Sequence, residues 1–178
     1  MITIFALQQI ENQLAKLQNR KPCEIRTGVF PKTFMEIFAM YNRIDHEIIF
    51  NKDFVYDSPE HEVIITLFHE SRHAYQWDRI NHPKKAVEST ELIEQWKREF
   101  EFFSPTDMAQ TEKDYLNMAI EIDAVAYTHL SMKHLTNELT VIPEPIKKAV
   151  IDRMTEIEKL EFPVYKSKLK VKNNADLN

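Results

Sequence analysis

The stretch VIITLFHESRH, from Val63 to His73, decides both the fold and the chemistry that this sequence predicts. It follows Asp57-Ser58-Pro59-Glu60, in which Asp57 can cap a helix, proline suits the first turn and the glutamate stands three residues after the cap. The run Val63–Phe68 is apolar on every side of such a helix, which is typical of a buried helix rather than a surface one. The sequence therefore predicts that the residues after Phe68 lie on a buried helix.

His69, Glu70 and His73 form an HExxH motif. Residues four apart lie on the same face of a helix, so His69 and His73 can bind one ion. A catalytic zinc takes three protein ligands and one water, whose proton Glu70 is placed to accept. The alternative is a surface helix with two ordinary histidines. The apolar context disfavours that alternative, because unpartnered imidazoles and carboxylates are costly to bury.

A third ligand is expected from the largely apolar helical run at 115–127, which carries Glu121 and Asp123. Buried carboxylates need a charge partner, and a metal ion supplies one. The two residues are two apart, about 200° around a helix, so they cannot both face the ion. One of them is expected to bind the metal, while the other could accept a hydrogen bond from a ligating histidine.

The pair of motifs, His69-Glu70-Ser71-Arg72-His73 and Glu121-Ile122-Asp123-Ala124, resembles the gluzincin zinc metallopeptidases. The compact chain resembles the minimal gluzincins of the ImmA/IrrE type, over roughly residues 35–130. This resemblance implies a zincin-like α+β fold, with Glu121 as the third ligand. It also implies hydrolysis of peptide bonds in a specific intracellular protein.

Several other classes of enzyme are excluded by the sequence. Metzincins need a glycine and a third histidine where Gln76 and Arg79 stand. SprT-like proteases often carry a cysteine zinc ribbon, which the single Cys23 cannot build. Gly28 is the one glycine, so phosphate-binding loops, dinucleotide fingerprints and GxSxG elbows cannot be formed.

Oxyanion stabilisation requires a hydrogen-bond donor near the metal. His129, on the helix of the expected third ligand, is the favoured catalytic candidate. Tyr75 and Tyr127 also qualify, but core aromatic roles explain them equally well. Arg72 qualifies too, although pairing with a surface glutamate is its simpler interpretation.

The composition is that of a globular protein. Of 178 residues, 43% are hydrophobic and 29% charged, which predicts one domain over 1–165 and a flexible tail over 166–178. A net charge of −5 argues against nucleic acid or a membrane surface as partner. A lone cysteine and the short apolar run at the N-terminus, too short for a signal peptide, predict a cytoplasmic protein. Nothing predicts the oligomeric state.

The expected architecture is α+β, a small antiparallel sheet beside the HExxH helix with further helices around it. The expected function is that of a zinc-dependent endopeptidase, whose protein or peptide substrate adds as a strand to the sheet edge. The alternative is a non-proteolytic zinc-containing regulatory or binding module. The remaining expected elements are helices over 3–19, 84–103 and 109–135, a further helix that follows Pro143 and Pro145 and runs to about Leu160, a strand over 23–30, and a hairpin of 34–41 with 47–50.

Overall fold

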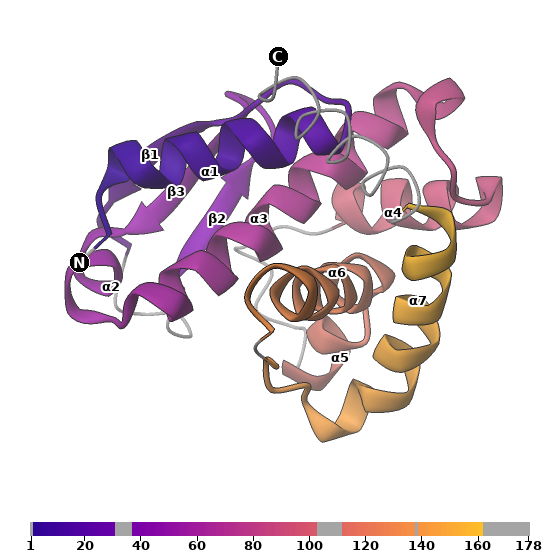
Figure 1. Cartoon of the computed structure of the whole chain (residues 1–178). Helices are drawn as coiled ribbons and strands as arrows, with labels where there is room; N and C mark the ends of the chain where they lie inside the picture. Colours follow the sequence, from indigo (N-terminus) through magenta and orange to yellow (C-terminus); the bar gives the residue numbers. More distant parts are fainter. Residues whose placement is uncertain (1, 31–36, 103–111, 138, 162–178) are drawn as a thin grey trace, which may run out of the picture. The chain divides into compact units, whose positions relative to one another are not determined.

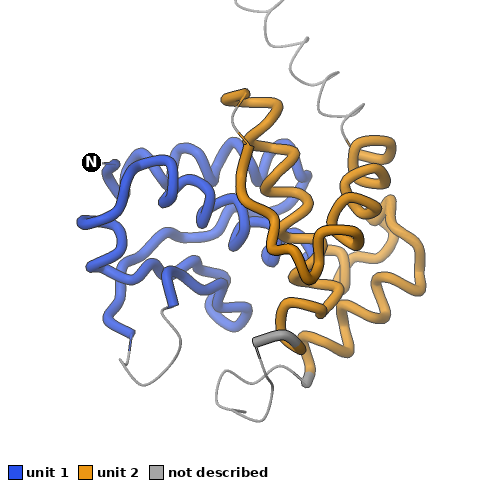
Figure 2. Tube along the Cα trace, turned by 90° about the horizontal axis from the view of Figure 1, so that it is seen from below, with its two compact units in different colours: residues 1–78 blue, residues 79–178 orange. Residues whose placement is uncertain are grey.

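The computed structural model describes residues 2–30, 37–102, 112–137 and 139–161. Its contacts divide the chain into two compact units, Met1–Asp78 and Arg79–Asn178, which Figure 2 colours separately. Each unit is described by itself below. The predicted tail lies outside the described residues, and the single domain stays a prediction. Among the described residues, no helix has the length and apolar character needed to cross a membrane.

Unit 1 begins with helix α1 (Ile4–Leu17), which confirms the amphipathic helix expected at this position. The side chain of Thr3 caps it by accepting a hydrogen bond from the amide of Ala6 at 3.1 Å. Leu7 and Leu14 on one face are buried, and α1 packs against strand β1 (Glu24–Gly28), as Figure 1 shows.

The sheet of unit 1 has three strands in the order β1-β3-β2. β2 (Ala39–Asn42) and β3 (Glu47–Asn51) form the predicted antiparallel hairpin, and Ile48 and Phe50 of the central β3 are fully buried. β1 pairs with β3 in parallel, so the sheet is mixed and the prediction of an antiparallel sheet was wrong. The reason is that residue patterns mark a strand but not its neighbour, and β1 pairs with the second strand after it rather than the next.

Two helices follow the sheet. The short α2 (Lys52–Asp57) was not predicted. The side chain of Asn51 caps this helix by accepting a hydrogen bond from Asp53 N at 3.1 Å. α3 (Glu60–Asn81) contains the HExxH motif as predicted, but the expected cap was wrong, because Asp57 is the last residue of α2 and α3 begins three residues after it. Its buried stretch starts later than expected: residues 64–66 are half-buried, while Leu67–Gln76 is buried except for His69.

Unit 2 is helical. The predicted helix over 109–135 is two helices, α5 (Glu112–Leu116) and α6 (Ala119–Thr136), and its residues 109–111 lie outside the described ones. α6 packs against α7 (Lys147–Leu160), which starts and ends as expected. The helix expected over 84–103 is shorter, α4 (Thr90–Phe102), and two 3₁₀ turns complete the unit: η1 (Pro83–Lys85) and η2 (Glu144–Ile146). The protein is thus an α+β fold built on a three-stranded mixed sheet and several helices.

Candidate metal centre

His69 and His73 lie one above the other on α3 and direct the same ring nitrogen toward each other. The two Nε2 atoms are 3.1 Å apart, and the rings are nearly perpendicular, at 84°. This is the arrangement that the four-residue spacing predicted. Two imidazole nitrogens at this distance offer a pair of lone pairs to one cation.

The tautomer of His73 is set by a residue that the sequence analysis did not identify. Nδ1 of His73 lies 2.9 Å from Oε1 of the fully buried Gln76, one turn further along α3. With Nδ1–H donating to that amide oxygen, Nε2 carries the lone pair that a metal needs. The sequence indicated this contact only by the separation of His73 and Gln76, since residues three apart on a helix lie side by side.

Glu70 connects the HExxH helix to the sheet. Its carboxylate is buried, and Oε2 accepts a hydrogen bond of 2.7 Å from the backbone amide of Tyr41 in β2. This contact confirms that the sheet lies beside the HExxH helix. Among the described residues Glu70 has no further hydrogen-bond partner, so Oε1 is open to accept a proton.

Ser71, inside the motif, is anchored from the other end of unit 1. Its hydroxyl accepts a hydrogen bond of 2.5 Å from Nη2 of Arg20, whose guanidinium also bonds both carboxylate oxygens of Glu11 at 2.7 and 3.0 Å. All three residues are buried. Glu11 also accepts from the amide of the buried Cys23 at 2.8 Å, and burial raises the pKa of the Cys23 thiol well above its ordinary value. No local pattern links residues this far apart in sequence.

Arg72 departs from its predicted surface role. It is fully buried, and its guanidinium lies 4.0 Å from the centre of the Tyr75 ring, a cation–π contact. Tyr75 and Tyr127 are buried, which confirms their interpretation as core aromatics.

Glu121 and Asp123 lie in unit 2, near the start of α6, and both are buried. Oδ1 of Asp123 accepts a hydrogen bond of 2.7 Å from Nε of Arg153 in α7. The charge of Asp123 is therefore balanced by an arginine. Glu121 stands in the first turn of α6, where the helix dipole favours a negative charge.

His129 lies on the same helix, eight residues after Glu121. It is buried, its Nδ1 is 2.9 Å from the hydroxyl of Thr140, and burial lowers its pKa below the ordinary value for histidine. The lowered pKa favours the neutral imidazole, which keeps one ring N–H as a hydrogen-bond donor.

The other histidines lie at the surface or in turns. His61 pairs with Glu62 at 3.3 Å and His134 with Glu158 at 3.5 Å, while His82 precedes η1. His46, in the turn between β2 and β3, is half-buried against the hydroxyl of Tyr41 at 3.1 Å.

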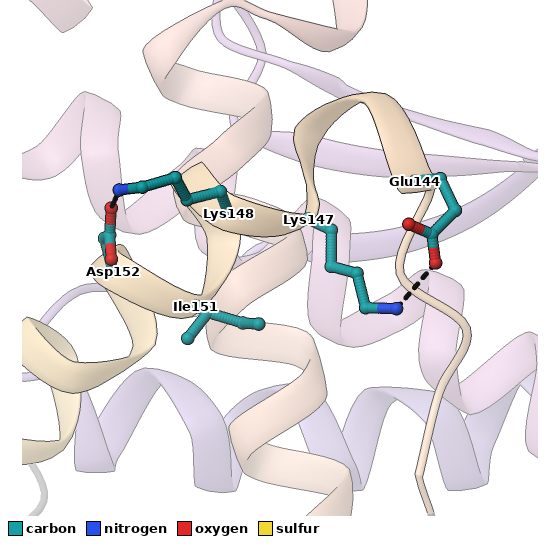
Figure 3. Close-up of a pocket in the computed structure, with 5 residues that line it drawn as sticks. All are labelled: Glu144, Lys147, Lys148, Ile151 and Asp152. Carbon is teal, nitrogen blue, oxygen red and sulfur yellow. Dashed lines mark hydrogen bonds and ion pairs between the residues drawn. The ribbon is translucent and has the colours of Figure 1, made fainter.

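A shallow hollow in unit 2, seen in Figure 3, offers no comparable chemistry. Lys147 and Lys148 of α7 line it and are paired with Glu144 and Asp152, both at 2.6 Å, and Ile151 completes its wall. The two lysines are well exposed and paired with carboxylates, and the residues that line the hollow do not form a set of metal ligands.

No protein-family model, curated protein or solved structure matches the chain. The case for a metal centre therefore depends on the geometry and chemistry of the residues described above.

Proposed function

We propose that the protein is a zinc-dependent endopeptidase in which His69, His73 and Glu121 bind one Zn²⁺ and Glu70 is the general base. Among the described residues, these three ligands are the side chains that could hold one ion together, with one ligand atom each. The observation that carries the proposal is the facing pair of Nε2 atoms, 3.1 Å apart, on the helix that also presents Glu70.

The residues fit the ion. Zinc–nitrogen distances of about 2.0–2.1 Å in a tetrahedral site require ligand nitrogens about 3.3–3.4 Å apart, close to the separation of the two Nε2 atoms. Gln76 holds His73 in the tautomer that leaves its Nε2 free of a proton. The ligand set of two histidines and one glutamate is a set that catalytic zinc uses in peptidases.

Bound Zn²⁺ supplies Lewis acidity, which lowers the pKa of water from 15.7 to about 7. Glu70 takes the proton of the attacking water on Oε1, while the amide of Tyr41 holds Oε2 and so fixes the direction of the carboxylate. The protonated carboxyl group then returns the proton to the leaving amine. We assign His129, a neutral imidazole with one N–H, as the candidate donor to the oxyanion.

The substrate side of this proposal rests on β2, which among the described strands lies at the edge of the sheet and pairs with β3. The edge of β1 is covered by α1, since Gln8 accepts from Ile25 N at 2.8 Å and donates to Cys23 O at 2.9 Å. Asn51 N donates to Phe38 O, which makes these two residues a hydrogen-bonded pair of the β2–β3 ladder. Hydrogen-bonded and non-hydrogen-bonded pairs alternate along antiparallel strands, so the peptide N–H and C=O of Tyr41 point away from β3. Because Tyr41 N already donates to Oε2 of Glu70, an extended peptide is expected to pair with the other outward peptide groups of this edge, beside Glu70.

The first test is zinc content. Protein purified without chelator should hold about one zinc per chain, and His69→Ala or His73→Ala should lose it, because each removes a third of the protein ligands. His61→Ala is the matched control, since His61 is an exposed histidine on the same helix. Full zinc content in both ligand variants would reject the metal centre.

The second test is cleavage. Glu70→Gln keeps an oxygen that can accept from Tyr41 N, so fold and zinc content should persist. Without a proton acceptor, cleavage should fall by about 10²–10⁴. Wild type and variant are incubated with a panel of unstructured and regulatory proteins, and fragments are read by mass spectrometry. Zinc in both forms with cleavage by neither would support the non-proteolytic zinc module instead.

A further inference from the structure

The N-terminus of α6 is capped by a residue from another helix. Met118 precedes the helix and makes no side-chain cap. Glu99 of α4 takes its place: Oε1 accepts from Ala119 N at 3.1 Å, and Oε2 accepts from Ile120 N at 2.9 Å. Gln95, one turn earlier on α4, donates to Oε1 at 3.0 Å and so orients the carboxylate.

These bonds end immediately before Glu121. The first amides of a helix have no partner within it, so an external acceptor decides whether the first turn stays closed. A carboxylate is the strongest such acceptor, because the bonds are charge-assisted and the helix dipole favours the negative charge. Glu99 therefore fixes the backbone of the two residues that lead into Glu121.

A second contact holds α6 on the other side of Glu121. Asp123 is bonded to Arg153 of α7 at 2.7 Å, and the same guanidinium lies 3.6 Å from Glu88. Glu121 thus stands between two anchored positions, one on each side in sequence. The bonds from Glu99 hold the first amides of α6, at Ala119 and Ile120, whereas the bond at Asp123 holds a side chain later in the helix.

We propose that Glu99 is a positioning residue that fixes the direction of Glu121 as a metal ligand, a role that rests on the proposed zinc site. Glu99 does not touch the ion. It determines how much ordering Glu121 must undergo when zinc binds, and hence the affinity of the site.

The experiment measures zinc affinity in the full chain by competition with a chromophoric chelator. Glu99→Ala should weaken zinc binding by about tenfold or more, as loss of a residue supporting a ligand typically does. Glu99→Gln, which keeps one acceptor oxygen, should recover part of the loss. Glu94→Ala is the matched control, an exposed glutamate on the same helix, and should bind zinc as wild type does.

A double-mutant cycle separates positioning from general destabilisation. In a Glu121→Ala background, Glu99→Ala should cause no further loss of zinc affinity, because its effect passes through Glu121. Hydrogen exchange of the metal-free protein gives an independent readout, in which the amides of Ala119 and Ile120 should exchange faster in Glu99→Ala than in wild type.

Three outcomes would overturn the positioning role. These are unchanged zinc affinity in Glu99→Ala, an equal loss in both backgrounds, or unchanged exchange at Ala119 and Ile120. A wild-type protein that binds no zinc would reject the proposed function and this role together. Zinc binding by wild type with an unaffected Glu99→Ala would reject only the role of Glu99.

Discussion

Glu70 is oriented by a main-chain amide, that of Tyr41, at 2.7 Å. A side-chain substitution at Tyr41 therefore leaves this bond in place. By contrast, His73 is oriented by the side chain of Gln76, at 2.9 Å, which a substitution can remove. The two residues of the motif thus differ in how readily their orientation can be disturbed.

Asp123 and Glu121 should respond differently to the same change. Asp123→Ala leaves Arg153 buried without its closest carboxylate, and breaking a buried ion pair typically costs about 3–5 kcal/mol of stability. Zinc affinity of the folded protein should change little. Glu121→Ala should instead weaken zinc binding far more than Asp123→Ala does, with a smaller loss of stability. Urea unfolding and zinc titration check both variants, with Asp152→Ala, which removes an exposed carboxylate, as the control. If only the Asp123 variant loses zinc, Asp123 is the metal ligand and Glu121 is not.

His129 should make stability depend on pH. Burial lowers its pKa in the folded state, so the unfolded chain binds the proton more readily. Its contribution is fully present above the ordinary pKa of about 6.5 and is lost as pH falls below that value. His129→Gln should therefore show a flatter fall in urea midpoint between about pH 7 and pH 5 than wild type. His134→Gln, which changes an exposed histidine, serves as the reference variant. If the urea midpoint of His129→Gln falls with pH as steeply as that of wild type, the lowered pKa of His129 is contradicted.

At the residue scale, the sequence predicted those contacts that depend on the spacing of residues along one helix. His69 and His73 face each other because both stand on one helix, and that followed from their separation. Tyr41, Arg20 and Gln8 were not predicted to contact the motif or the sheet edge, since each acts from a distant part of the chain. Arg72 was misassigned because an arginine in a motif carries no sign of whether it is buried.

At the scale of elements, the helices and strands with regular apolar spacing were predicted, among them α1, α3 and the β2–β3 hairpin. The break between α5 and α6 was not predicted. Asn117-Met118 contains neither glycine nor proline, and the acceptor that caps α6 belongs to Glu99, about twenty residues earlier. The parallel pairing of β1 depends on strand order, which no single segment determines.

Gly28 should be intolerant of a side chain for a steric reason. It has no positive φ, but a Cβ at this position would lie 2.9 Å from Cγ2 of Ile49 in the neighbouring β3. Gly28→Ala should therefore destabilise the protein by about 1–3 kcal/mol, the usual cost of overpacking. Urea unfolding measures the change, and Thr27→Ala, at the adjacent position of β1, is the control. A stability equal to that of wild type would show that β1 can shift without cost.

For the whole molecule, the contacts group the chain into two compact units, and the single domain over 1–165 stays a prediction. Composition and length set the amount of core but not how contacts group along the chain. The boundary falls near the end of α3, where continuous helical periodicity gives no sign of it.

Metal removal should lower the stability of the protein, because zinc is expected to bind the folded chain and not the unfolded one. Zinc present at about 100 times its Kd stabilises a folded protein that binds it by about 2.7 kcal/mol. Addition of a chelator should lower Tm accordingly, and zinc should restore it. Glu121→Ala should show a much smaller shift, because its affinity is reduced. A Tm of wild type that is independent of chelator would contradict a bound structural or catalytic ion.

The buried thiol of Cys23 can be used to measure how often the surrounding part of unit 1 opens. It is the one thiol in the chain, it is 1% exposed, and its raised pKa keeps it in the unreactive protonated form while folded. A thiol reagent should therefore modify the chain only when this part of unit 1 opens. Because the bond from Cys23 N to Glu11 ties this site to Arg20 and Ser71, the labelling rate reports how often the segment that carries the HExxH motif is released. Pulsed labelling at increasing reagent concentration would thus give the opening and closing rates of unit 1 without any introduced probe.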